Sequence, residues 1–371
     1  MRGHIFRRFR GSYQIVLYLG KDPVTGKYKQ KWIAVKGKRR NAEHTMSELI
    51  HQYNLTGYID TTRLTTKEFL ERWLSVIKSN LSAQSYERSA SIVHQHLIPD
   101  FGNIAISKLM PEDLQRHYAR QLAAGLKPGT VKKHHATIHA ALAAAVKWGL
   151  IYRNIADIVD SPRYKRVEME TWDADEMNVF LDRNVDSEYY PLFYTALFTG
   201  MRRSELLGLK WMDIDFLMCQ VAVRRTLEHL TDGSYLFQDV KTEKSRRNIS
   251  LSPNVIGVLR NLFNSQPVKL TAPDSLVFSG PAGQPLRPNT VSRAWQLACR
   301  KAGVKVIRLH DARHTHATLM LKQGVHPKIV QERLGHSSIQ MTLDTYSHVV
   351  PGLQEAAALK FDELVKQKTN N

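Results

Sequence analysis

The feature that most constrains the fold is a continuous helical stretch, residues 61–162. In it, apolar side chains recur at helical spacing and form one stripe, made of Phe69, Leu70, Trp73, Leu74 and Ile77. Ser82 is a suitable N-cap, and Gly149 ends the series. The expected helices span residues 66–78, 82–97, 111–124 and 130–148, with a break at 99–102. The stretch therefore predicts an all-helical domain over 61–160.

A strand pattern precedes this stretch. Residues 12–19 alternate with period two, which places Tyr13, Ile15, Leu17 and Leu19 on one face. A second strand is expected over 30–36 and a helix over 42–53. The sequence therefore predicts a small sheet supported by one helix at the N-terminus.

A mixed pattern follows the helical stretch. The basic linker 161–166 leads into a segment that is mostly helical, with a short sheet near residues 217–251. Residues 351–371 form an amphipathic pattern after a Pro-Gly break, which predicts a terminal helix that packs on its own domain or on a neighbouring protomer. Together, these patterns predict an α+β multidomain protein.

Positive charge indicates the class of partner. The 371 residues carry 53 Lys and Arg against 34 Asp and Glu, a formal net charge of +19. Residues 1–60 hold +8 of it, residues 61–163 hold +6 and the rest holds +5. Such an excess favours a polyanion, nucleic acid first, over a soluble protein that is basic for other reasons.

Particular basic residues fit this interpretation. Arg39 and Arg40 lie in a basic turn beside the N-terminal strands, and Lys132 and Lys133 lie near the start of the helix over 130–148. We expect all four to bind DNA, although solvated surface charges would look the same in the sequence. For residues 61–162, a helical bundle without a role in DNA binding fits the sequence as well as a helical clamp on the DNA backbone does.

Several other classes of protein are excluded. Two cysteines, Cys219 and Cys299, are too few for a disulfide scaffold or a cysteine-rich zinc site. No run of about 18 apolar residues is present, and the basic N-terminus has no apolar segment behind it, so neither a membrane span nor a signal peptide is expected. We expect a cytoplasmic, nucleoid-associated protein without a cofactor.

Four short segments of the last 170 or so residues carry candidate chemistry. In the first, an apolar helix ends at Gly200 and a new helix begins with Arg202 in its first turn, where free backbone N–H groups and a guanidinium suit a phosphate. Glu205, three residues on, is placed to orient Arg202, although such a pair is usually a surface ion pair.

The second segment, residues 239–249, is expected to be a β-hairpin with Lys241 at the tip of the incoming strand and Arg246 and Arg247 on the return strand. We expect Arg246 and Arg247 to bind DNA, although a charged hairpin tip is usually only solvated. In the third, His310 and Arg313 share a helix face and could together bind a phosphate. A zinc site is not favoured there, because the H-E-x-x-H pattern is missing and Arg313 would repel a cation.

The fourth segment holds His336 and, ten residues later, Tyr346, which alone would be taken for a core residue. In order, the six residues Arg202, Lys241, His310, Arg313, His336 and Tyr346 resemble the catalytic set of the tyrosine recombinase (phage integrase) family. Segments 199–206, 309–317 and 332–337 resemble that family closely, while Ala312 replaces a larger apolar residue.

The resemblance implies transesterification at a DNA phosphodiester, with no metal and no cofactor. Tyr346 would attack phosphorus to give a 3′-phosphotyrosyl link, with His310 as the base that takes its proton. Arg202, Arg313 and His336 would stabilise the transition state, and Lys241 would protonate the leaving 5′-oxygen. Glu205 would support Arg202.

The resemblance also implies the architecture and the partners. Residues 1–58 would be an arm-binding domain with a three-stranded sheet and a helix, residues 61–160 a helical, SAM-like core-binding domain, and residues 168–371 the catalytic domain with its tail helix. The partners would be the core and arm attachment sites of double-stranded DNA, three further protomers in a tetramer, and excision and host DNA-bending factors. The open alternatives are a type IB topoisomerase-like relaxing enzyme and a non-catalytic DNA-binding regulator.

Overall fold

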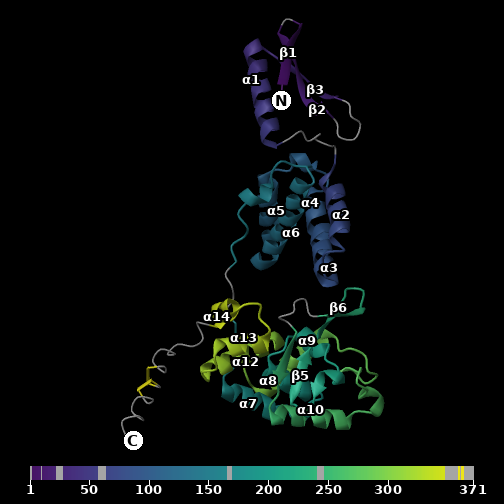
Figure 1. Cartoon of the computed structure of the whole chain (residues 1–371), viewed down its shortest axis with the longest axis vertical. Coiled ribbons are helices and arrows are strands. Elements are labelled where there is room, and N and C mark those ends of the chain that lie inside the picture. Colours follow the sequence, from purple (N-terminus) through teal and green to yellow (C-terminus); the bar gives the residue numbers. More distant parts are fainter. Residues whose placement is uncertain are drawn as a thin grey trace. The chain divides into compact units, whose positions relative to one another are not determined.

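The computed structural model of the chain describes residues 2–9, 11–21, 28–56, 64–164, 169–239, 246–346, 358–359 and 361–362. The chain divides into two compact units, Met1–Lys165 and Arg166–Asn371 (Figure 1). Both units contain many helices. Among the described residues, the first unit has a three-stranded sheet, and the second unit has a three-stranded and a two-stranded sheet. Within the described ranges, no helix combines the length and the apolar character needed to cross a membrane.

The N-terminal part of the first unit is a three-stranded antiparallel sheet with a helix packed on one face. Its strands occur in the order β1 (Arg2–Phe9), β2 (Ser12–Lys21) and β3 (Tyr28–Lys36), and the helix is α1 (Arg39–Thr56). Ile15 and Leu17 are buried with Ala42 of α1, which confirms the predicted inner face for these two strand residues. The opposite face exposes Phe6 and Trp32, whose rings stack 6.4 Å apart.

The rest of the first unit is helical. Phe69, Leu70, Trp73 and Leu74 are buried in one core, as the predicted stripe requires. Thr65 begins the first helix with a reciprocal capping box to Glu68. The elements are α2 (Thr66–Ile77), α3 (Ala83–Ile92), the π-helix η1 (Val93–Leu97), α4 (Ile98–Phe101), α5 (Pro111–Ala123) and α6 (Pro128–Lys147), with the 3₁₀ turns η2 (Ile106–Lys108) and η3 (Ile155–Ile158).

The expected break at residues 99–102 is wrong. The helix continues past Pro99 and ends only at Gly102. In the wider turn of η1, the N–H of Ile98 bonds to the carbonyl of Val93, five residues back, and Pro99 then lies in the first turn of α4. A proline is tolerated there because its missing N–H is not needed.

A buried polar cluster lies between these helices. His117 contacts the carboxylate of Asp100 through Nδ1, and its Nε2 lies 3.3 Å from Nδ1 of His134. The ring of His96 lies 4.4 Å from that of His134. Burial, followed by repulsion from His96 and His117, lowers the pKa of His134 to about 4, so this imidazole is neutral in the native protein.

The second unit packs helices around a large apolar core. Trp172, Phe180, Phe193 and Trp295 lie at its centre, and the two tryptophan rings stack 5.3 Å apart. The helices are α7 (Ala174–Arg183), α8 (Tyr190–Thr199), α9 (Arg203–Leu207), α10 (Pro253–Ser265), α11 (Pro288–Ala302), α12 (Leu309–Lys322), α13 (Pro327–Leu334) and α14 (Ile339–Tyr346), with the 3₁₀ turns η4 (Trp211–Asp213) and η6 (Val268–Leu270).

Two small sheets lie in the segment where one short sheet was predicted. One contains β4 (Ile214–Asp215), β5 (Gln220–Val223) and β8 (Arg247–Ser250), and the other contains β6 (Arg225–His229) and β7 (Tyr235–Asp239). The predicted hairpin over residues 239–249 is therefore wrong, because β7 pairs with β6 whereas β8 pairs with β5. The sequence indicated a short sheet in this segment but could not reveal which strands pair with one another.

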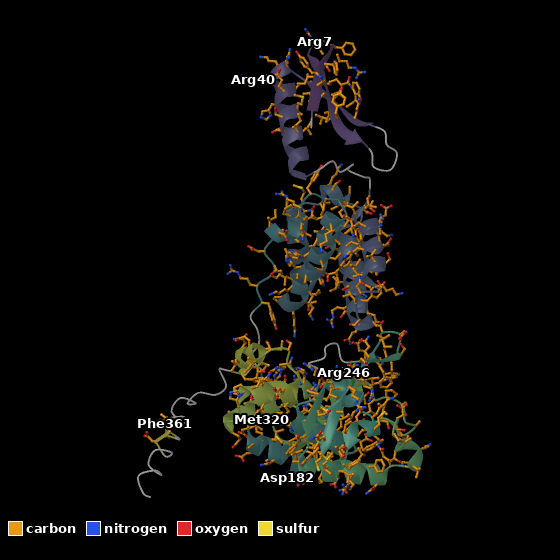
Figure 2. The ribbon with its side chains drawn as sticks, in the orientation of Figure 1. Arg7, Arg40, Asp182, Arg246, Met320 and Phe361 are labelled. Carbon is orange, nitrogen blue, oxygen red and sulfur yellow. The ribbon has the colours of Figure 1, made fainter. Side chains whose placement is uncertain are left out.

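The predicted tail helix, residues 351–371, lies mostly outside the described residues. Leu359 and Phe361, which lie within the predicted range, are helical and exposed. Phe361 is labelled in Figure 2.

Candidate active site

The first site residue, Arg202, stands at the junction of two helices. α8 ends at Gly200, which has a φ of +63°, and Arg202 is the N-cap of α9. A Cβ at Gly200 would lie 2.7 Å from a methyl carbon of Leu334 and 2.8 Å from the ring of His316. Glycine is required here both for the left-handed turn and for the close approach of α12 and α13.

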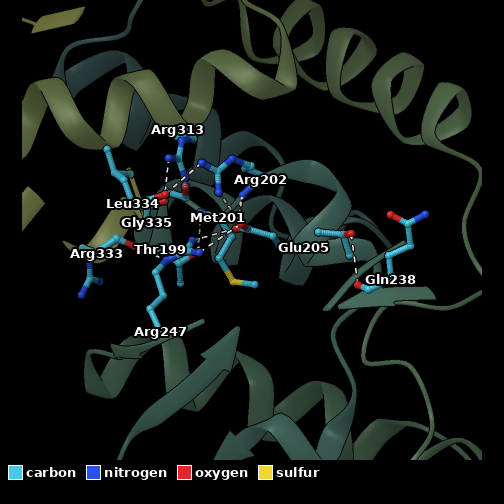
Figure 3. Close-up of polar contacts among 12 residues, drawn as sticks. Thr199, Met201, Arg202, Glu205, Gln238, Arg247, Arg313, Arg333, Leu334 and Gly335 are labelled. Atoms are coloured by element: carbon cyan, nitrogen blue, oxygen red, sulfur yellow. Dashed lines mark hydrogen bonds and ion pairs between the residues drawn. The ribbon is translucent and has the colours of Figure 1, made fainter. Parts of the chain in front are cut away.

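Glu205 organises the guanidinium groups around it (Figure 3). Its carboxylate accepts hydrogen bonds from the backbone N–H of Arg202 at 2.8 Å and from Nη1 of Arg202 at 2.7 Å. It also accepts bonds from Nη1 of Arg247 at 3.1 Å and from Nη2 of Arg247 at 2.8 Å. Burial raises the pKa of Glu205, but hydrogen bonds and charge from Arg247 and Arg202 outweigh it and lower the pKa to about 2. Glu205 is therefore an anion throughout the neutral range.

Arg313 is buried, and its charge interacts with that of Arg202. Its Nη1 donates to the carbonyl of Gly200 at 2.8 Å, and its Nη2 donates to the carbonyl of Leu334 at 2.7 Å. Arg202 donates to the next carbonyl, that of Gly335, at 3.2 Å. These bonds join the segments around residues 200, 313 and 335, which are far apart in the sequence.

The site holds more positive than negative charge. Burial, followed by repulsion from Arg202, lowers the pKa of Arg313 to about 9, which still leaves it protonated at neutral pH. Glu205 can offset the charge of one guanidinium, but Arg202, Arg247 and Arg313 all surround it. The side chain of Arg202 is 35% exposed, so an anion can reach it from solvent. This arrangement suits a phosphodiester.

The histidine His336 is buried and neutral. Its Nδ1 lies 2.9 Å from the hydroxyl of Thr342, and its carbonyl accepts a bond from Gln331 at 2.8 Å. Burial, followed by the charges of Arg313 and Arg202, lowers its pKa to about 3. A neutral imidazole held at Nδ1 by a hydroxyl leaves Nε2 to donate a hydrogen bond to a phosphate oxygen.

Tyr346, the last residue of α14, is 1% exposed. Its hydroxyl lies 2.8 Å from Nδ1 of His314, a residue that the sequence prediction did not include. Burial raises the pKa of Tyr346 to about 12, even though the charge of Arg313 lowers it. His310 is exposed, and its ring lies 5.2 Å from that of His314. A signal for His314 was present in the sequence, since it follows Arg313 and lies one helical turn after His310.

The remaining predicted site residues are placed as follows. Lys241 lies outside the described residues. Arg246 is exposed and pairs with Asp239 at 2.7 Å (Figure 2). The side chains of Arg39, Arg40, Lys132 and Lys133 are all exposed. Arg39 also forms an ion pair with Glu43 at 2.9 Å.

Arg247 differs from its expected place. We expected a hairpin side chain open to DNA, but its side chain is only 6% exposed and is bound to Glu205. Its Nε also donates to the carbonyl of Arg333 at 2.7 Å. The guanidinium points inward because β8 pairs with β5 and presents this position to α9 and α13. The expectation of a surface DNA contact is therefore corrected to that of a support for Glu205.

The surface beside Arg247 is also basic. An open cavity of about 620 Å³ is lined in part by Arg224, Arg225 and Arg246, with Asp239 as an acidic neighbour. Arg225 is paired with Asp213. Among the described residues, no group of three His, Cys, Asp or Glu side chains is arranged to hold a metal ion.

Comparison with known proteins identifies the class. Residues 170–351 match the phage integrase family, and residues 65–122 match the N-terminal SAM-like domain of phage integrases. Together these two matches cover more than half of the chain. The chain belongs to the phage integrase family, and it is a tyrosine recombinase.

Individual relatives cover most of the chain. The ICEBs1 integrase of Bacillus subtilis (strain 168) is 26% identical over 364 residues, which cover 96% of this chain and 98% of that protein. An integrase of Saccharopolyspora erythraea is 25% identical over 78% of this chain and 80% of its own length.

Solved structures show the same fold. The Tn1549 transposon integrase in complex with a circular intermediate DNA has a TM-score of 0.67 and 21% identity, over 81% of this chain and 99% of that chain. A lambda integrase tetramer bound to a Holliday junction has a TM-score of 0.58 and 19% identity, over 90% of this chain and 95% of that chain.

Proposed function

We propose that this recombinase integrates and excises a mobile element by cleaving and rejoining DNA at Tyr346. The observation that carries the proposal is the union of Arg202, Arg313, His336 and Tyr346 in one positively charged site. Attack of the Tyr346 oxygen on phosphorus forms a 3′-phosphotyrosyl bond and releases a 5′-hydroxyl. Rejoining is the reverse reaction with a new 5′-hydroxyl, so the bond energy is retained and no cofactor is needed.

The transition state gains negative charge on its non-bridging oxygens. Arg202 and Arg313 stabilise that charge with their guanidinium groups, and His336 donates a further hydrogen bond. Glu205 and Arg247 hold Arg202 in place from behind. Lys241 protonates the leaving 5′-oxygen, a role that rests on the resemblance alone.

The other domains bind DNA. Residues 1–58 bind arm sites, residues 61–160 bind the core site, and residues 168–371 carry out the chemistry. The exposed basic side chains Arg40, Lys132 and Lys133 and the basic cavity beside Arg246 support backbone contacts. The active assembly is a tetramer, as in the lambda structure, and excision and host DNA-bending factors set the direction of the reaction.

Covalent trapping tests the proposed function. The full chain is incubated with a nicked suicide substrate built from the core site, which is sought in the DNA that flanks the gene. Wild-type protein should form a protein–DNA adduct that survives denaturation, and Tyr346→Phe should form none. An adduct with Tyr346→Phe would show that the nucleophile is a different residue.

The N-terminal assignment has its own test. Deleting residues 1–58 should abolish binding to arm-site DNA and leave cleavage of the isolated core site intact, as measured by gel shift and suicide-substrate cleavage. Unchanged arm binding by the deletion variant would contradict it. Relaxation of a supercoiled plasmid that lacks any attachment site would instead favour the topoisomerase-like alternative. The relatives, which are named as integrases, do not favour that alternative.

A further inference from the structure

The hydroxyl of the proposed nucleophile is bound by an unassigned histidine. Tyr346 Oη and His314 Nδ1 lie 2.8 Å apart, and the two ring centroids are 5.7 Å apart. Tyr346 ends α14, whereas His314 lies in α12, directly after Arg313. The resemblance had assigned the base to His310 instead.

The protonation states suit a transfer from Tyr346 to His314. Burial, followed by repulsion from His310, lowers the pKa of His314 to about 4, so its imidazole is neutral and can accept a proton at neutral pH. Tyr346 holds its proton because burial raises its pKa. The groups around His314 are His310, Asp311 and Arg313 on its own helix, Arg308 at the N-cap of that helix, and His336 and Tyr346 from the chain that follows α13.

The helix places two functions side by side. Residues 310, 313 and 314 lie within about one turn of α12 and thus on neighbouring positions of its surface. Arg313 faces the anion site next to Arg202, while His314 faces Tyr346. His310 is exposed at the same end, where it can bind a phosphate oxygen together with Arg313.

We propose that His314, rather than His310, is the base that accepts the phenolic proton of Tyr346. This inference rests on the proposed function of Tyr346. As the bond from Oη to phosphorus forms, the proton passes from Oη to Nδ1 of His314. The bond from phosphorus to O5′ breaks, and the general acid protonates that oxygen. In rejoining, the imidazolium of His314 returns its proton to the departing Tyr346 oxygen.

His314→Asn separates proton transfer from mere support. The Asn carbonyl oxygen can occupy the place of Nδ1 and accept the Tyr346 hydrogen bond, but it cannot take the proton. Single-turnover cleavage of the suicide substrate by the full chain should fall about 10²–10⁴-fold, the range of general-base catalysis. The residual rate should rise with pH, because solvent hydroxide must replace the base. His310→Asn should keep the pH profile of the wild type.

A second substrate tests whether the slow cleavage by His314→Asn comes from loss of the general base or from loss of the general acid. A 5′-bridging phosphorothiolate has a leaving thiolate that needs no protonation. It should leave the defect of His314→Asn in place, whereas it should rescue Lys241→Ala. Thermal melting and gel shift on core-site DNA check that His314→Asn is folded and binds.

The outcomes are distinct. His314→Asn could instead cleave within about threefold of the wild-type rate and keep the wild-type pH profile. The rate loss would then be far below the roughly 10²-fold or more expected for removal of a general base, and His314 would be at most a support for Tyr346. If the phosphorothiolate rescues His314→Asn, the residue acts on the leaving group and the inference is also wrong. If wild-type protein forms no adduct at all, the proposed function itself fails.

Discussion

Histidines that are buried or half-buried occur in both units, and they have oppositely charged neighbours. In the first unit, His117 and His134 lie beside the carboxylate of Asp100. In the second unit, His314 and His336 lie beside the guanidinium groups of Arg313 and Arg202. The first cluster has a carboxylate as a direct partner of its histidines, whereas in the second the guanidinium groups outnumber the one carboxylate among them, that of Glu205. This difference separates a structural polar network from the proposed phosphate-binding site.

The largest effect is expected from Arg313. Arg313→Lys removes the fork that holds Gly200 and Leu334 and that would bind the phosphate. Single-turnover cleavage should fall about 10²–10³-fold, as for the loss of one transition-state donor. The exposed Arg300 on α11 offers Arg300→Lys as the matched control, which should cleave like the wild type. Equal rates for both variants would contradict the role of Arg313.

Glu205 tests whether the proposed catalytic site depends on the buried network that joins this carboxylate to Arg202 and Arg247. Glu205→Gln leaves the buried Arg247 without its counter-charge, and loss of one partner of a buried pair costs about 3 kcal/mol or more. The free energy of unfolding from urea titration should drop accordingly. Glu170→Gln is the control, because its pair with Lys305 is exposed and worth about 1 kcal/mol or less. A cost no larger than that of the control would show that the network is dispensable.

The histidine cluster of the first unit predicts a pH effect on stability. The pKa of His134 falls from its ordinary 6.5 to about 4 in the folded protein, so below pH 6.5 the unfolded chain binds a proton that the native protein does not. The stabilisation is complete above pH 6.5 and is lost as the pH falls toward 4, up to about 3 kcal/mol.

Thermal melting across this pH range measures the effect. His134→Gln should flatten the fall in melting temperature, whereas the exposed His94→Gln should leave it unchanged. A fall of the same steepness in His134→Gln would mean that other groups cause the acid sensitivity.

The smallest effect is expected at Gly335. It has a φ of +65°, and a Cβ there would lie 2.9 Å from Nη1 of Arg247. Gly335→Ala should cost about 1–2 kcal/mol for the left-handed backbone, plus the cost of displacing Arg247. Gly303→Ala is the control, since φ is +73° and the space beside it is open. Calorimetry should show a larger loss at Gly335, and an equal loss would argue against the close approach.

Much of this site could be predicted from residue order. The helical spacing of apolar residues predicted the helices of the first unit over 66–78, 111–124 and 130–148, and the i, i+3 spacing of Arg202 and Glu205 correctly indicated an ion pair. The resemblance supplied the six catalytic positions, which no single segment would have justified.

The rest depended on contacts between distant residues. The inward direction of Arg247 follows from the pairing of β8 with β5, which local alternation does not encode. Likewise, the hydroxyl of Tyr346 meets His314 across 32 residues of sequence. Residues 310 and 314 are both histidines on one helix, so only the fold distinguishes which of them contacts Tyr346.

The measurement that tests the central claim most directly is the mapping of the covalent adduct. Wild-type protein is trapped on the suicide substrate, the DNA and protein are digested, and the nucleotide-bearing peptide is identified by mass spectrometry. The account predicts a phosphodiester link to the side chain of Tyr346 and to no other residue. A nucleotide on any other side chain would contradict it.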